Sequence, residues 1–131
     1  MGRNMTNTQD ASSLGRRWWE LVDKAAFREA AALAAPGAVI NWVLSNERMR
    51  IADQWVAANE NYPGSWRAEI NGTVAEPGKV VTVTTVSDGP ESVTAISIFT
   101  IEDGRIAGIV EYWPQPYSAP GWRRQWVSPI E

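Results

Sequence analysis

The strand predicted over residues 105–113 carries the carboxylate that is the strongest candidate for acid/base chemistry. Alternation along this strand places Ile109 and Trp113 on the same face as Glu111. If that face is buried, Glu111 is a lone carboxylate among apolar side chains, and desolvation raises its pKa towards values that suit general acid/base catalysis. The structural alternative is an ion pair between this carboxylate and one of three arginines, Arg48, Arg50 or Arg67.

Three polar residues are weaker candidates for contacts with a ligand. Asn41 shares a strand face with Val39 and Val43, where its amide either orients a ligand carbonyl or bonds the backbone at the strand edge. Asn59 lies near the end of a predicted helix and either points into a cavity mouth or is solvated. Tyr62 closes the apolar stripe of that helix, so it belongs to the core or offers its hydroxyl to a ligand.

The composition is unusually rich in tryptophan, with eight Trp against three Tyr and two Phe. Because a large aromatic side chain buries roughly 150–250 Å², eight of them supply much of a core or line a pocket. We expect Trp18, Trp55 and Trp66 in the core or in a pocket wall. We expect Trp122 and Trp126 to pack back over the sheet or across a dimer.

The same composition excludes several functions. The 131 residues contain no Cys and no His, which rules out disulfides, thiolate nucleophiles, zinc-thiolate sites and Ser-His-Asp triads. The acidic residues are scattered and no phosphate loop or nucleotide fingerprint occurs, so we expect no metal and no cofactor. A net charge of −3 without a basic stripe argues against nucleic-acid binding. No apolar run approaches the roughly 20 residues of a membrane span, so we expect a cytoplasmic protein.

The elements that must position these residues follow from periodicity and turn signals. A first helix is expected from a cap at Ser12 or Ser13, and a second begins at Phe27 and is ended by Pro36-Gly37. The remaining elements are a strand, a helix and four strands, expected over 38–44, 50–62, 66–74, 79–87, 91–101 and 105–113.

This order of elements predicts an α+β fold, with helices first and a meander of antiparallel strands after them. Residues 1–12 are expected to be a flexible start. Residues 13–131 are expected to form a single domain, which includes an irregular tail from residue 114 that is anchored by its aromatic side chains.

Three stretches resemble the NTF2-like superfamily and, within it, the SnoaL-like proteins. They are RWWELVDKAAF at 17–27, APGAVINWV at 35–43 and SIFTIEDGRIAGIVEYW at 97–113. The resemblance implies a cone in which N-terminal helices pack in a strongly curved antiparallel sheet. It also implies a pocket for a small, mostly apolar molecule, and a homodimer formed through the outer face of the sheet.

The resemblance also narrows the chemistry. Trp18, Asn41 and Ser97 stand where ketosteroid isomerases carry a Tyr, an Asp base and a protonated Asp, so typical isomerase chemistry is not expected. The Asp-Arg-Asp set of the epoxide hydrolases is incomplete, because residues 80–86 are all Val or Thr. A SnoaL-type cyclase needs only one carboxylate acting as acid or base, and Glu111 is the natural candidate.

Two functions therefore stay open. The first is binding of a small apolar or aromatic molecule in the cone, with cofactor-free acid/base catalysis of cyclase, isomerase or hydrolase type through Glu111. The second is a non-catalytic ligand-binding or dimeric interaction module. The candidate ligand-binding residues are Trp18, Asn41, Trp55, Asn59, Tyr62, Trp66, Ser97, Ile109 and Trp113.

Overall fold

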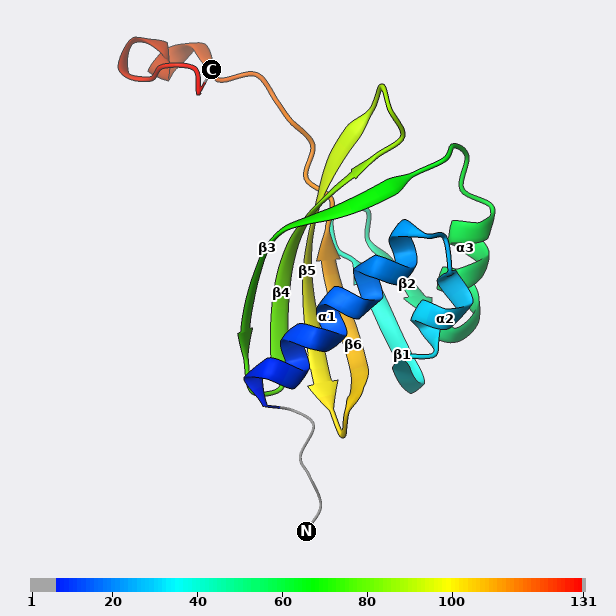
Figure 1. The fold of residues 1–131 in the computed structure, drawn as a ribbon. Coiled ribbons are helices and arrows are strands. Elements are labelled where there is room, and N and C mark those ends of the chain that lie inside the picture. Colours follow the sequence, from blue (N-terminus) through cyan, green and yellow to red (C-terminus); the bar gives the residue numbers. More distant parts are fainter. Residues whose placement is uncertain (1–6, 131) are drawn as a thin grey trace.

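Helices pack against one face of a curved, unclosed six-stranded sheet, and no helix of the described part of the chain covers the other, bare face (Figure 1). The structure is a computed structural model that describes residues 7–130. It confirms the predicted α+β class. The helices are α1 (Thr8–Asp23), α2 (Phe27–Ala31), a π-helical turn (Ile51–Trp55) and α3 (Val56–Glu60). The strands are β1 (Ala34–Trp42), β2 (Glu47–Arg50), β3 (Arg67–Glu76), β4 (Lys79–Ser87), β5 (Ser92–Glu102) and β6 (Arg105–Tyr112).

The strand order is β2-β1-β6-β5-β4-β3. All neighbouring strands are antiparallel except β1 and β6, which run parallel. The parallel pair joins segments from opposite ends of the chain, and it sets Trp42 of β1 beside Glu111 of β6. Sequence periodicity predicts both of these strands but not their pairing, because the pairing depends on how distant segments meet.

Helix α1 begins earlier than expected. Asn7 caps it, with its side-chain oxygen accepting the backbone N–H of Asp10 at 2.8 Å. The expected cap at Ser12 or Ser13 is therefore wrong, and residues 8–12 are helical rather than part of a flexible start; residues 1–6 lie outside the described part. Gly15 lets α1 approach the sheet, since a Cβ there would lie 3.2 Å from Val80.

The second helix also ends earlier than expected. It stops at Ala31, and β1 has already begun at Ala34, so Pro36-Gly37 does not end a helix. These two residues instead lie inside β1, where its pairing with β6 shifts register between Ala34 and Val39. Gly37 adopts a φ of 81°, a left-handed conformation that glycine tolerates and that such an irregularity requires.

The helix expected over 50–62 is shorter than predicted and follows a strand that the sequence did not reveal. Strand β2 (Glu47–Arg50) forms a hairpin with β1, and the helical segment then starts with the π-helical turn and ends with α3. An exposed ERMR segment carries no alternation of apolar and polar residues, so only its partner β1 identifies it as a strand.

The β5–β6 hairpin confirms the predicted Asp-Gly turn. Asp103 and Gly104 have φ values of 50° and 75°, as a tight turn of this type requires. Beyond the turn, the register shifts so that Ile101 pairs with Ile106 and Thr100 with Gly108. Because of this extra residue, the Ile106 side chain points into the core on the same side as Ile109. Simple alternation would place these two side chains on opposite faces of the strand.

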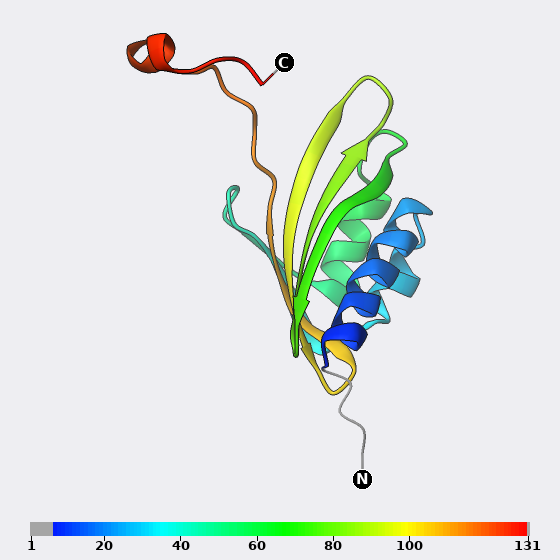
Figure 2. The same cartoon turned by 60° about the vertical axis from the view of Figure 1, so that its left-hand side comes forward.

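The last segment, which we call the C-terminal arm (residues 114–130), extends away from the body of the molecule on the side opposite the helices (Figure 2). It contains a 3-10 turn, Gly121–Trp126, within otherwise irregular chain. Trp122 and Trp126 are 72% and 70% exposed. The expectation that they pack back over the sheet of their own chain is wrong. No helix among the described residues is long and apolar enough to cross a membrane.

Candidate functional site

A cavity of about 980 Å³ opens between the helices and the sheet. Its wall is dominated by aromatic rings. Six of the eight tryptophans line it, namely Trp18, Trp19, Trp42, Trp55, Trp66 and Trp113. Phe27, Tyr62 and the aliphatic side chains of Val22, Val86 and Val93 complete much of the wall. Such a cavity suits a ligand that is itself largely apolar.

Glu111 lies in this wall and is only 2% exposed. The Ser97 hydroxyl donates to its Oε2 at 2.6 Å. The indole N–H groups of Trp42 and Trp113 donate to its Oε1 at 2.9 and 3.1 Å. Sheet register builds this arrangement, because Ser97 of β5 and Trp42 of β1 are the direct cross-strand neighbours of Glu111.

The environment of Glu111 favours its neutral form. Burial raises the pKa of this carboxyl, since the charged form loses its hydration, and the hydrogen bonds from Ser97, Trp42 and Trp113 oppose the shift without cancelling it. No arginine or lysine among the described residues forms an ion pair with it. Glu111 is thus a buried acid whose partners are neutral.

The alternative of an arginine partner is wrong, because each of the three arginines is bound elsewhere. Arg48 donates to Asn41 at 2.9 Å, and Arg50 pairs with Asp53 at 3.0 Å. Arg67 pairs with Asp23 at 2.8 Å.

The deep wall consists of packed aromatic rings from α1, α2 and the π-helical turn. The rings of Trp18 and Trp55 lie 4.4 Å apart between centroids, and Phe27 meets Trp55 edge-on. Trp19 is fixed by a buried hydrogen bond from its indole N–H to the Thr82 hydroxyl at 2.9 Å. Packing among these rings and the hydrogen bond of Trp19 therefore hold this part of the wall in place.

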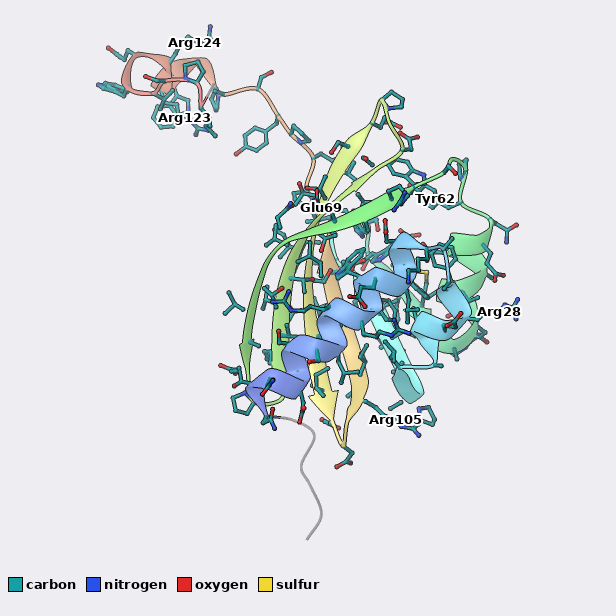
Figure 3. All side chains as sticks on the ribbon, in the orientation of Figure 1. Arg28, Tyr62, Glu69, Arg105, Arg123 and Arg124 are labelled. Carbon is teal, nitrogen blue, oxygen red and sulfur yellow. The ribbon has the colours of Figure 1, made fainter. Side chains whose placement is uncertain are left out.

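The mouth is more polar and more open. Tyr62 is 53% exposed near the loop between α3 and β3 (Figure 3), and its ring meets Trp66 edge-on. Trp66 is held by a hydrogen bond from its indole N–H to the carbonyl of Pro63 at 2.8 Å. Asn59 also lines the cavity, but its amide is used by a hydrogen bond to the Trp55 carbonyl at 2.9 Å.

Three predicted site residues do not line the cavity. Asn41 lies on the outer face of β1, since its neighbours Ile40 and Trp42 point inward, and its side chain accepts from Arg48. Ile109 is core, 2% exposed. Ser97 is fully buried behind Glu111 and reaches the cavity only through that carboxylate. The other predicted residues, Trp18, Trp55, Asn59, Tyr62, Trp66, Trp113 and Glu111, lie together in the wall.

Sequence reasoning missed Trp42 as a partner of Glu111 and left Trp19 without a place. The sequence does carry a signal for Trp42, because strand alternation puts it on the same face as the apolar Ile40. The prediction of Asn41 as a ligand contact assumed that the opposite face of this strand points into the cavity. The signal for Trp19 was absent, since its partner Thr82 is 63 residues away in sequence. Among residues 7–130, no group of three or more acidic side chains converges as a metal site would require.

Comparisons with known proteins place this geometry in a family. The structure of a proposed ketosteroid isomerase from Kribbella flavida superposes with a TM-score of 0.89 at 23% sequence identity, covering 97% of this chain and 94% of that one. An NTF2-like protein of unknown function from Burkholderia xenovorans gives a TM-score of 0.74 at 22% identity, covering 91% and 94%. An epoxide hydrolase of the LEH type from M. tuberculosis gives 0.66 at 19%, covering 82% and 84%.

These likenesses lie below 25% identity and show the fold alone. A search of curated proteins found none that matches this chain. The family model for the SnoaL-like domain matches residues 15–109, which is most of the chain and includes the second half of α1 and the strands from β1 to the middle of β6. The chain therefore belongs to the SnoaL-like family, with the NTF2-like fold.

Proposed function

We propose that the protein binds a small apolar or aromatic organic molecule in the cavity and that Glu111 acts on it as a general acid or base. One observation carries this proposal: a buried carboxyl lies in the wall of an indole-lined cavity, held only by neutral donors. Maintaining such a group costs stability, and sites of this kind are enriched at functional positions.

The geometry suits proton transfer without a cofactor. Protonated Glu111 can donate to a carbonyl, hydroxyl or epoxide oxygen in the cavity. After it gives up the proton, the two indole N–H groups on Oε1 and the Ser97 hydroxyl stabilise the carboxylate that forms. The packed rings of Trp18 and Trp55 hold the ligand and exclude water.

The test uses Glu111→Gln, which keeps the shape and the hydrogen-bonding pattern of the protonated acid but cannot transfer the proton. Binding of 2-naphthol is followed by quenching of tryptophan fluorescence. Turnover is measured with styrene oxide and with a β,γ-unsaturated ketone, which report hydrolysis and isomerisation. We expect 2-naphthol affinity within about threefold of the parent protein and turnover reduced at least a hundredfold. Failure of the parent protein to bind 2-naphthol contradicts the proposed ligand class.

A second candidate is a non-catalytic binding module, and one observation favours it. Both oxygens of Glu111 are already occupied by hydrogen bonds within the protein, as expected of a structural carboxyl. Under this alternative, 2-naphthol binds, neither reactant is turned over, and Glu111→Gln changes neither result. The matched control is Glu91→Gln, which neutralises an exposed carboxylate that lines the same cavity.

We also propose a homodimer formed through the bare outer face of the sheet, with each C-terminal arm packed against the partner chain. Support comes from the apolar side chains on that face, such as Val74 and Val83, and from Tyr117, Trp122 and Trp126 of the arm, all of which are exposed. Burying three aromatic residues per chain removes roughly 300–600 Å² from water, a substantial part of a stable interface. Light scattering at several concentrations tests this. We expect a dimer for the full chain and weaker association when the chain is ended after Gln115.

A further inference from the structure

The ionisable side chains in the cavity wall are mostly acids. Five ionisable side chains line it: Glu60, Arg67, Asp88, Glu91 and Glu111. Arg67 is bound to Asp23 through two nitrogens, at 2.8 and 3.0 Å, and Glu60 is bound to Arg28 at 3.0 Å. The ionisable groups of the wall that remain outside these ion pairs are three acids, one deep and two at the rim.

The deep acid is surrounded by aromatic rings. Trp42 and Trp113 meet edge-on, with centroids 6.2 Å apart, and direct their N–H groups at Glu111. Trp18 and Trp55 line the same cavity and pack on each other. The face of an indole ring carries negative potential and attracts cations, most strongly where water is excluded. The faces of the rings and an ionised carboxylate thus contribute potential of the same sign.

We propose that the ligand of this cavity is an aromatic or polycyclic amine, whose protonated nitrogen lies against Glu111 between the indole rings. This inference rests on the proposed function and specifies the ligand class. An ammonium group stabilises the ionised form of Glu111 through a charge-assisted hydrogen bond, and it supplies the buried counter-charge that no side chain among the described residues provides. A neutral ligand gains only an ordinary hydrogen bond there, and an anionic ligand meets three acids.

The two rim acids contribute in a different way. Asp88 and Glu91 lie at the turn between β4 and β5, where the Asp88 carboxylate accepts the backbone N–H of Glu91 at 3.1 Å. They are nearer to solvent than Glu111, so salt screens their attraction for a cation. They attract the ligand to the mouth, and Glu111 determines which ligand stays.

The experiment compares three probes that share one ring system: 2-naphthylmethylamine, 2-naphthalenemethanol and 2-naphthoic acid. Dissociation constants are measured by calorimetry at pH 7 with the full chain. We expect the amine to bind at least tenfold more tightly than the alcohol, and the acid to bind most weakly. In Glu111→Gln we expect the amine and the alcohol to bind within about threefold of each other.

Glu91→Gln is the matched control, because it removes the same charge from the rim. We expect it to keep the preference for the amine within about threefold and to weaken the salt dependence of amine binding. If the parent protein binds the alcohol as tightly as the amine, the amine proposal is overturned while the proposed function stands. If the preference survives in Glu111→Gln, Glu111 is not the counter-ion and the proposal is overturned. If none of the three probes binds, the proposed function itself fails.

Discussion

The tryptophans of this protein divide into two groups that lie in opposite environments. Six line the cavity, and the two of the C-terminal arm stand clear of the body on the same segment as Arg123 and Arg124 (Figure 3). The residue type is the same, so the difference comes from what surrounds it. Within the cavity, each indole has rings or a polar acceptor as partners, whereas in the arm the partner of Trp122 that the structure gives is the neighbouring Arg123.

The largest expected effect comes from removing a ring of the cavity group. Trp18 is 1% exposed and packs on Trp55 and Phe99, so we expect Trp18→Ala to lower the free energy of unfolding by about 3–5 kcal/mol. Trp122→Ala should change it by less than about 0.5 kcal/mol in dilute protein. Urea denaturation measures both. Similar losses at the two positions would contradict the distinction between the cavity tryptophans and those of the arm. If Trp18→Ala does not fold, Trp18→Phe provides a milder variant.

A smaller effect is expected from the polar anchor of the cavity group. Thr82→Val keeps the shape of the side chain but leaves the Trp19 N–H buried without its acceptor, so we expect a loss of about 1–3 kcal/mol. The control is Thr85→Val on the same strand. Its hydroxyl bonds the Asn71 side chain at a more exposed place, and the expected loss is below about 1 kcal/mol. Equal losses in thermal or urea unfolding would show that the Trp19 bond has no special weight.

The raised pKa of Glu111 predicts a pH dependence of stability with a definite sign. Its pKa is raised in the folded protein above the ordinary value of 4.5, so between these two values the unfolded chain releases the proton first. Stability is therefore highest, as far as Glu111 is concerned, below pH 4.5, and it falls as the pH rises towards the folded pKa. The slope in this window is at most about 1.4 kcal/mol per pH unit.

Urea denaturation of the parent protein and of Glu111→Gln at several pH values between 5 and 8 measures this slope. We expect the slope to be missing in Glu111→Gln. Asp23 acts at a different pH. Its bonds to Arg67 and to the Ala68 N–H hold its pKa below the ordinary 3.8, so its stabilisation is lost only as the pH falls through that lower value. A parent protein and a Gln variant with parallel profiles above pH 5 would contradict the assignment of a raised pKa to Glu111.

The smallest expected effect is spectroscopic. Replacing both arm tryptophans, in Trp122→Phe/Trp126→Phe, should leave stability in dilute protein unchanged within about 0.5 kcal/mol. The fluorescence that remains should be quenched much less by acrylamide, because the exposed indoles are gone. At high concentration, protection of these two indoles in the parent protein would indicate that the arm packs on a partner. Quenching that is unchanged in the variant would contradict the exposure of the arm.

Several features were accessible from local sequence. The alternation in 105–113 correctly placed Ile109, Glu111 and Trp113 on one face, and the Asp103-Gly104 turn was correct because its chemistry is local. Local reasoning failed where a distant partner decides the outcome. Strand β2 exists because β1 lies beside it, and Asn41 points outward because Ile40 and Trp42 fill the core side of β1.

The sequence by itself determined the α+β class. It also placed Glu111 on an apolar face of a strand and provided enough tryptophans to line a cavity. Only the tertiary structure decided what Glu111 faces. The parallel pairing of β1 with β6 brings Trp42 to its side, and β5 brings Ser97, so a carboxyl that sequence left open to an arginine is held by neutral donors instead. The physical reason is that alternation fixes the face of a strand, whereas the identity of a partner depends on strand order and register between segments far apart in the chain.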